Sequence, residues 1–209
     1  MTIIDISRNL QIGMAVWPGD SPYHLETIMD RRQGHAVNLT TLTLSAHTGS
    51  HADAPRHFTD DGLTMDAVDL RPYWGPALVV TVNKAAGPLL PSDFAAYDLR
   101  GAERLLVRTP LQDLPFDQFP DDLPHPSPAL ADFLGKLGIL LYGTDTPSMD
   151  AIDSHDLPGH NALLRNGIDI LEGLDFSGVV DGRYELVALP LKIVGGDGSP
   201  VRAALRPLT

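Results

Sequence analysis

Three histidines and one aspartate within residues 47–57, HTGSHADAPRH, constrain this chain more than any other stretch. The spacing of four between His47 and His51 suits one face of a helical turn, and the spacing of two between His51 and Asp53 suits one face of a strand. Gly49 permits an unusual turn, and Pro55 favours an extended backbone at the residue before it. The sequence therefore predicts a turn followed by an extended loop, with His47, His51 and Asp53 converging on one point.

Histidine and aspartate are ligands that zinc takes when no thiolate is present. The chain has no cysteine, so a metal site in it must be built from His, Asp and Glu. A buried network of histidine–aspartate hydrogen bonds is the alternative interpretation of the same residues. His57 lies beyond the proline, and it is either a further ligand or a free imidazole available for proton transfer.

Glu172 is the second unusual residue of the sequence. Ile168, Ile170 and Glu172 alternate along a predicted strand, which turns the carboxylate toward the interior. Burial of a carboxylate is costly unless it is paired or bound to a metal. The pattern therefore indicates a ligand, and the alternative is a residue at the end of a strand that reaches solvent.

Composition restricts the classes of partner. The formal net charge of −12 and the pI of about 4.8 argue against nucleic acid and against anionic membrane surfaces, which both require basic residues. The N-terminus has no basic segment before a long apolar run, so we expect no signal peptide, and no segment approaches the length of a membrane span. We expect a soluble cytoplasmic protein, with residues 1–209 forming a single domain.

Hydrophobic periodicity predicts strands that alternate with a few helices. Strands are expected at residues 3–7, 38–46, 77–82, 103–109, 139–142, 168–172, 184–193 and 201–205. A short helix is expected to begin at Ser92, a longer one to run from Ser127 to Gly138, and another to carry His160 within residues 159–165. Residues 111–126 and 195–200 are expected to be loops. The fold class is therefore α/β or α+β with a mixed sheet.

Residues 47–58 resemble the HxGTHxDxPxH signature of the cyclase family of metal-dependent hydrolases, and within that family the resemblance is to the bacterial kynurenine formamidases. It covers nearly the whole chain and includes residues 5–7, 17–20, 143–148, 170–173 and 197–203. Ser50 stands where the signature has threonine, which keeps the hydroxyl. Asn161 stands where these formamidases have a second histidine, beside the one that matches His160.

The resemblance implies a swivelling β/α/β fold and two divalent metal ions per chain, zinc first and manganese as the alternative. His47 and His51 would bind one ion and His160 the other, while Asp53 and Glu172 would contact both. Water activated by the ions would attack an amide. No G-x-S-x-G motif is present, so a serine nucleophile is disfavoured.

The implied substrate is a small aromatic amide, N-formyl-L-kynurenine, which would be hydrolysed to L-kynurenine and formate. His57 would act as general base and acid. Trp17 lies in a turn, where by itself it would be interpreted as a core residue, but the resemblance implies an aromatic wall against the substrate ring. The resemblance also implies a homodimer or a larger homo-oligomer.

Two other functions remain open at this point. One is hydrolysis of a different cyclic or aryl amide, such as isatin, with manganese in the site. The other is a non-catalytic protein that stores or senses a divalent metal, which predicts metal binding without turnover of any amide and leaves His57 without a role.

Overall fold

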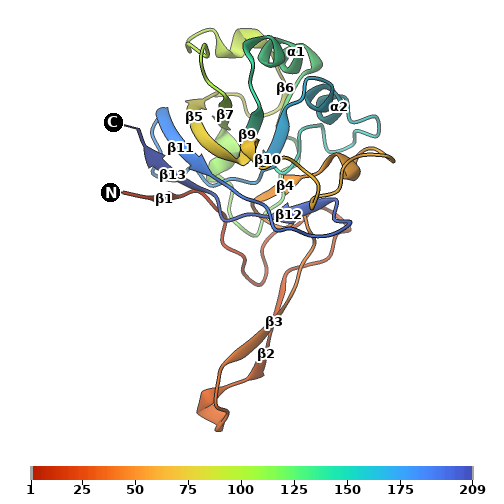
Figure 1. The fold of residues 1–209 in the computed structure, drawn as a ribbon, viewed down its shortest axis with the longest axis vertical. Helices are drawn as coiled ribbons and strands as arrows, with labels where there is room; N and C mark the ends of the chain where they lie inside the picture. Colours follow the sequence, from red (N-terminus) through yellow and green to blue (C-terminus); the bar gives the residue numbers. More distant parts are fainter. Residues whose placement is uncertain (1, 209) are drawn as a thin grey trace.

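Nine strands pair into one mixed sheet in the computed structural model, which describes residues 2–208 (Figure 1). In the order in which they pair, the strands are β1 (Ile4–Asp5), β13 (Ala204–Pro207), β11 (Gly182–Val187), β5 (Trp74–Thr81), β7 (Arg104–Arg108), β9 (Leu141–Thr144), β10 (Asp169–Glu172), β4 (His51–Asp53) and β12 (Gly198–Pro200). The pairings β5–β7, β7–β9 and β9–β10 are parallel, and the other pairings are antiparallel. The mixed sheet predicted from the sequence is confirmed.

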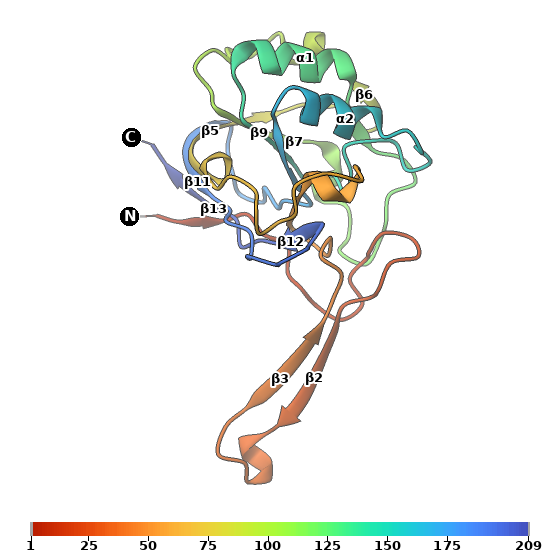
Figure 2. The ribbon, with the colours of Figure 1, turned by 45° about the vertical axis from the view of Figure 1, so that its right-hand side comes forward.

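Both faces of the central strands are buried. Leu105 and Val107 of β7 belong to the core beneath the helices α1 (Pro128–Leu137) and α2 (Pro158–Arg165), while Leu106 belongs to the core on the opposite face. Figure 2 shows the two helices stacked over one face of the sheet. Parallel strands that are covered on both sides carry continuous apolar runs rather than alternating ones, which explains the sequence of β5 and β7.

The predicted limits of α1 are confirmed by its capping contacts. The Ser127 hydroxyl accepts a hydrogen bond from the backbone N–H of Leu130 at 3.1 Å, and Gly138 ends the helix in the left-handed conformation. The predicted cap at Ser92 is wrong. A short 3-10 helix, η4 (Pro91–Phe94), begins one residue earlier with Leu90 as its N-cap, and the Asp93 carboxylate accepts from the N–H of Leu90 at 2.7 Å.

A long hairpin of β2 (His24–Met29) and β3 (Leu39–Thr43) extends away from the sheet (Figures 1 and 2). Every residue in both strands is exposed, and the 3-10 helix η1 (Arg31–Gln33) lies between them. The sequence did not predict β2. The strand expected at residues 38–46 ends at Thr43, and a turn separates it from the histidine cluster. The alternating residues correctly indicated a strand, but they did not specify what it packs against.

Several predicted loops contain short elements. Residues 111–126 include the end of η5 (Pro110–Asp113) and the strand β8 (Pro124–Pro126), which pairs with β6 (Gly87–Leu89). The expected loop at residues 195–200 contains β12, and the strand expected at 184–193 ends at Val187. The remaining 3-10 helices are η2 (Pro55–His57) and η3 (Arg71–Tyr73). Within residues 2–208, no helix combines the length and apolar character that crossing a bilayer requires.

Candidate metal centre and active site

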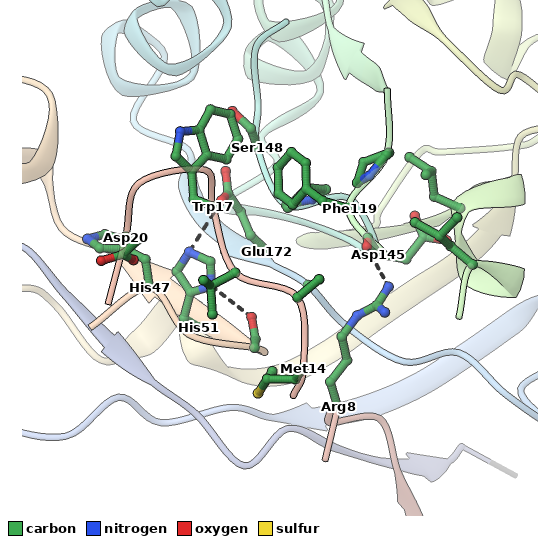
Figure 3. Close-up of a pocket in the computed structure, with 18 of the residues that line it drawn as sticks. Arg8, Met14, Trp17, Asp20, His47, His51, Phe119, Asp145, Ser148 and Glu172 are labelled. Atoms are coloured by element: carbon green, nitrogen blue, oxygen red, sulfur yellow. Dashed lines mark hydrogen bonds and ion pairs between the residues drawn. The ribbon is translucent and has the colours of Figure 1, made fainter. Parts of the chain in front are cut away.

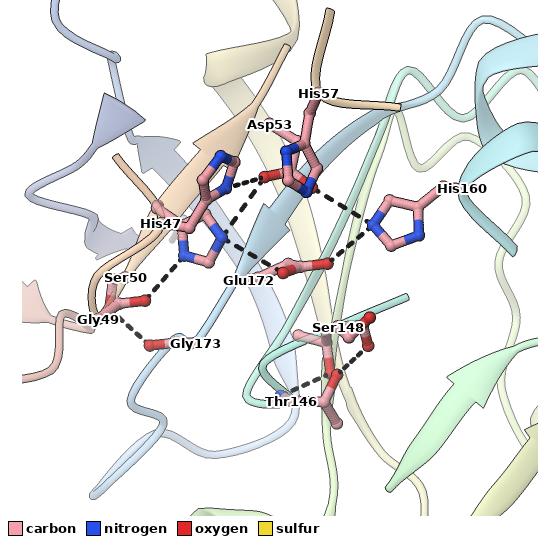
Figure 4. A network of polar contacts seen from close by, with 12 residues as sticks. His47, Gly49, Ser50, Asp53, His57, Thr146, Ser148, His160, Glu172 and Gly173 are labelled. Carbon is pink, nitrogen blue, oxygen red and sulfur yellow. Dashed lines mark hydrogen bonds and ion pairs between the residues drawn. The ribbon is translucent and has the colours of Figure 1, made fainter. Parts of the chain in front are cut away.

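The central cluster is built on the antiparallel pair of strands β4 and β10. Their register places His51 directly opposite Glu172, and Asp53 follows His51 on the same face of β4 because side chains alternate along a strand. His47 enters from the turn before β4, and His160 enters from the first turn of α2. Figure 4 shows these side chains pointing toward one another.

Each carboxylate of the cluster faces two or three imidazoles. Nε2 of His51 lies 3.4 Å from Oδ1 of Asp53 and 3.3 Å from Oε2 of Glu172. Nε2 of His160 lies 3.4 Å from Oδ2 of Asp53 and 3.4 Å from Oε1 of Glu172. Nδ1 of His47 lies 3.0 Å from Oδ1 of Asp53. The structure thus brings together all five residues that the sequence and the resemblance marked as ligands.

The second nitrogen of each of these imidazoles faces a fixed acceptor. Nδ1 of His51 donates to the carbonyl oxygen of Gly49 at 2.9 Å, and Nδ1 of His160 donates to Oδ2 of Asp150 at 2.7 Å. Nε2 of His47 lies 3.2 Å from Oδ2 of Asp197. Metal-binding histidines have this arrangement in general, because the outer acceptor sets the tautomer and orients the ring.

The cluster is buried, and two of its carboxylate oxygens lack a hydrogen bond within residues 2–208. His51, Asp53, His160 and Glu172 are each 3% exposed. Oδ2 of Asp53 and Oε1 of Glu172 have no hydrogen-bond partner among the described residues. Buried carboxylate oxygens are costly unless a cation or a donor compensates them. Two carboxylates with imidazole nitrogens aimed at the same points are therefore a donor set that fits divalent cations.

The electrostatics of the cluster lead to the same conclusion. Burial acts to lower the pKa of His51, but its hydrogen bonds to Asp53 and Glu172 outweigh burial and raise the pKa to about 10. Burial acts to raise the pKa of Asp53, but contacts with His160, His47 and His51 hold it well below its usual value. Two ionised carboxylates thus require positive charge beside them, from protons on the imidazoles or from metal ions that replace those protons.

Two sets of three ligand atoms are compact enough to hold an ion. In each set, His51 with Asp53 and Glu172, and His47 with Asp53 and His57, the ligand atoms lie within 4.8 Å of one another. Asp53 belongs to both sets. The ring of His57 lies 4.0 Å from that of His47, and its side chain is 35% exposed. The geometry therefore allows His57 either role considered from the sequence, ligand or proton carrier.

The cluster opens into a cavity of about 680 Å³. Trp17 is half-buried and lines this cavity, where its ring meets Phe119 edge to face with centroids 5.3 Å apart (Figure 3). Met14, Val16, Leu114 and Phe116 add further apolar surface. Trp17 therefore lies in the wall of the cavity and not in the core, so an aromatic compound entering the cavity has a ring to pack against.

The structure shows what the two residues that depart from the family pattern contact. The Ser50 hydroxyl accepts from the N–H of Arg8 at 2.9 Å and donates to the carbonyl of Gly173 at 2.6 Å, so the hydroxyl that serine keeps is used in two hydrogen bonds. Asn161 is exposed and donates to the carbonyls of Asp156 and Leu157 at 3.0 Å each. It therefore supports the turn before α2 and does not line the cavity.

Sequence reasoning missed several residues around the cluster. Asp150 and Phe119 carried no motif or periodicity that separated them from ordinary loop residues. Asp197 lay in a stretch that supported the family resemblance, but no role was attached to it. Arg8 was not singled out. Arg8, Phe119 and Asp197 reach the site across long separations in the sequence, which local patterns do not report, and Asp150 reaches His160 from a loop ten residues before it.

Comparison with known proteins identifies the family. A family model described as putative cyclase matches residues 4–151. The kynurenine formamidase of Salinibacter ruber is 46% identical, covering 99% of this chain and 98% of the relative, and that of Bacillus mycoides is 42% identical, covering 98% and 97%.

Similar solved structures belong to hydrolases as well. A potential metal-dependent hydrolase with cyclase activity superposes with a TM-score of 0.85 at 26% identity and covers 99% of each chain. Isatin hydrolase A from Labrenzia aggregata superposes with a TM-score of 0.83 at 25% identity and covers 98% of this chain and 93% of that one. These matches extend over the whole sheet and both helices, and this chain belongs to the cyclase family of metal-dependent hydrolases.

Proposed function

We propose that this protein hydrolyses N-formyl-L-kynurenine to L-kynurenine and formate. The observation that supports this most strongly is a buried cluster of three histidines and two carboxylates at one side of a cavity walled by Trp17 and Phe119. A formylated aromatic amine needs both parts, polar groups at the amide and an aromatic wall for the ring. The similarity to kynurenine formamidases at 42% and 46% identity supports the choice of amide.

Two divalent ions would be held by the cluster, zinc as the family resemblance implies and manganese as the alternative, since imidazole and carboxylate ligands accept both. His47 and His51 would bind one ion and His160 the other, with Asp53 and Glu172 between them. Such ions supply Lewis-acid polarisation and a water molecule of lowered pKa. Asp150, Asp197 and the Gly49 carbonyl would keep the three histidines in the required tautomers.

His57 would transfer the protons of the reaction. Its Nδ1 lies 3.5 Å from Oδ2 of Asp197, which leaves Nε2 for transfer at the edge of the cavity. This nitrogen would take a proton from the attacking water and return it to the amide nitrogen as the C–N bond breaks. Trp17 and Phe119 would hold the aryl ring, so that the formyl group reaches the cluster and not the bulk solvent.

The test is an assay of metal-loaded protein with N-formyl-L-kynurenine, read by formation of kynurenine, together with elemental analysis. Turnover with close to two equivalents of metal is expected. Full metal occupancy without turnover of any aryl formamide would overturn the proposal and favour a metal-storing or metal-sensing protein. An occupancy that stays at one after supplementation would reject the two-ion site but keep the reaction.

A second candidate is hydrolysis of isatin, which the fold shared with isatin hydrolase A supports. The same assay with isatin separates the two. A kcat/KM for isatin that exceeds the value for N-formyl-L-kynurenine would favour this candidate.

We also propose that the protein is a homodimer, and that residues 1–209 form one domain whose terminal strands β1 and β13 pair in the same sheet. The hairpin of β2 and β3 supports self-association, because its strands expose the apolar side chains of Leu25, Ile28, Met29, Leu39 and Leu42. Light scattering should give twice the chain mass of 22.5 kDa, and a Leu39→Asp, Leu42→Asp variant should give the single mass. A monomeric wild type would exclude this assembly.

A further inference from the structure

Arg8 differs from the other cations of this acidic chain. It is the only arginine or lysine among the described residues that line the cavity, whose other fixed charges are acidic. Elsewhere arginines pair with aspartates, as in Arg32–Asp30 and Arg100–Asp98. Among residues 2–208 no such ion pair is found for Arg8, whose Nη2 donates to the backbone carbonyl of Asp145 at 3.0 Å (Figure 3).

The position of Arg8 is fixed relative to the metal cluster. Its backbone N–H donates to the Ser50 hydroxyl at 2.9 Å, and the same hydroxyl donates to the carbonyl of Gly173 at 2.6 Å. Ser50 precedes His51, and Gly173 follows Glu172. One buried hydroxyl therefore ties the Arg8 backbone to the residues that flank both cluster strands, and the Asp145 carbonyl holds the guanidinium at the cavity.

A carboxylate of opposite charge, Asp175, also lines the cavity. Oδ1 of Asp175 accepts from Nε2 of Gln112 and from the N–H of Ser177, both at 2.9 Å. Burial acts to raise the pKa of Asp175, but these hydrogen bonds and the charge of Arg8 lower it, so the carboxylate is ionised at neutral pH. Arg8 and Asp175 thus present opposite charges to the same cavity without forming an ion pair with each other.

We infer that Arg8 binds the α-carboxylate of an amino-acid substrate and that Asp175 binds its α-ammonium group. This rests on the proposed function, which it sharpens: the substrate class is an aryl formamide that carries a zwitterionic amino acid. A guanidinium has five N–H donors in a planar fork that matches a carboxylate, and the Asp145 carbonyl engages only Nη2 of Arg8. The cluster would then bind the formamide, the aromatic wall would bind the ring, and Arg8 with Asp175 would bind the amino acid of one molecule.

This assignment also separates the two candidate substrates. N-formyl-L-kynurenine carries a carboxylate and an ammonium group at the end opposite the formamide. Isatin is neutral and has neither group, so it gains nothing from Arg8. The charged pair is a reason for the site to prefer the first compound, because only that compound gains charge-assisted hydrogen bonds from it.

The first experiment compares two substrates on the metal-loaded enzyme. One is N-formyl-L-kynurenine, and the other is 2-formamidoacetophenone, which keeps the aryl ketone and the formamide but lacks the amino acid. Arg8→Met keeps the length of the side chain and removes its charge and donors. It should lower kcat/KM for the first substrate by roughly 10- to 100-fold, the usual worth of a hydrogen bond to a charged group, mainly through KM. Hydrolysis of the truncated substrate should be nearly unchanged.

The matched variants define the effect. Arg8→Lys should fall between wild type and Arg8→Met, because it keeps the charge but loses the fork. Arg100→Met removes an arginine on the surface, outside the cavity lining, and should affect neither substrate. An equal loss on both substrates in Arg8→Met would mean that Arg8 supports the fold of the site, and no loss on either would mean that it does not touch substrate. Both outcomes overturn the inference.

A binding measurement tests the role of Arg8 even if the protein does not catalyse the proposed reaction. Calorimetry with L-kynurenine and with 2-aminoacetophenone requires no turnover. Arg8→Met and Asp175→Asn should each raise the dissociation constant of L-kynurenine by about 10-fold or more and leave that of 2-aminoacetophenone unchanged. If wild type hydrolyses neither formamide, the proposed function fails, and these dissociation constants still decide the role of Arg8. Equal binding of L-kynurenine by wild type and both variants would overturn it.

Discussion

Nδ1 of His160 lies 2.7 Å from Oδ2 of Asp150, and both side chains are almost fully buried. The same carboxylate accepts the backbone N–H groups of Gly159 and His160 at 2.6 and 3.0 Å. Asp150 therefore satisfies the start of α2 and sets the tautomer of the histidine that α2 carries, so that Nε2 of His160 faces Asp53 and Glu172.

Asp150→Asn should weaken metal binding by roughly 10- to 100-fold, the usual effect of losing the outer partner of a metal-binding histidine. The amide keeps the shape of the side chain but can no longer accept at both oxygens. Metal affinity is measured by competition with a chromogenic chelator. Asp153→Asn, an exposed aspartate three residues away, is the control. Unchanged affinity in Asp150→Asn would show that the contact is not needed for the site.

His57→Ala should lower kcat by about 10² to 10⁴, the range for a general acid–base group, while metal content persists. The five-residue ligand set does not require His57, but His57 also belongs to a compact group with His47 and Asp53. Elemental analysis of the variant distinguishes the roles. If the protein loses an equivalent of metal together with activity, His57 is a ligand.

Asp197→Asn should lower kcat, which reports proton transfer, more than it weakens substrate binding. Oδ2 of Asp197 lies 3.2 Å from Nε2 of His47 and 3.5 Å from Nδ1 of His57, so it is a positioning residue for both rings. We expect a decrease of about 10-fold or more in kcat for an aryl formamide. The loss should be smaller for an aryl formate ester, whose phenolate leaves without a proton from His57. The same loss on amide and ester would indicate a purely structural role.

Trp17→Ala should raise KM for N-formyl-L-kynurenine and leave N-methylformamide, which has no ring, largely unaffected. Aromatic contact contributes about 0.5–1.5 kcal/mol beyond the burial of area. The measurement is kcat/KM for both compounds. Phe119→Ala provides a matched comparison, because its ring meets Trp17 edge to face on the same wall. An equal loss on both compounds would indicate that Trp17 maintains the shape of the cavity.

Asp169→Asn should stabilise the protein at neutral pH. Burial raises the pKa of Asp169 to about 6, although the Tyr73 hydroxyl donates to it. The folded state therefore binds more protons than the unfolded state between about pH 4 and 6, and stability falls as the pH rises through that range. The uncharged amide avoids this penalty, so the gain should be about 3 kcal/mol above pH 7. Denaturant unfolding with chelator present, so that metal loss does not contribute, checks it.

The pH dependence of that gain is the critical part. It should shrink as the pH is lowered from 6 toward 4, because Asp169 becomes protonated in the folded wild type. A constant difference between wild type and Asp169→Asn across this range would mean that the gain does not come from the charge.

The sequence by itself determined the local parts of this protein. Spacing alone placed His51 and Asp53 on one face, and alternation with Ile168 and Ile170 turned Glu172 inward, because strand geometry acts over two to four residues. The same holds for the capping of α1 by Ser127 and Gly138. These features depend on the backbone conformation of neighbouring residues, which a sequence states directly.

Only the tertiary structure decided which distant residues meet the cluster. Asp197 reaches His47 across 150 positions, and Arg8 reaches Asp145 across 137. Such contacts depend on the order in which strands join the sheet, here β10, β4 and β12 side by side, and no periodicity encodes that order. The exposed hairpin of β2 and β3 has the same origin, since alternation in the sequence indicates a strand but not the surface that will cover it.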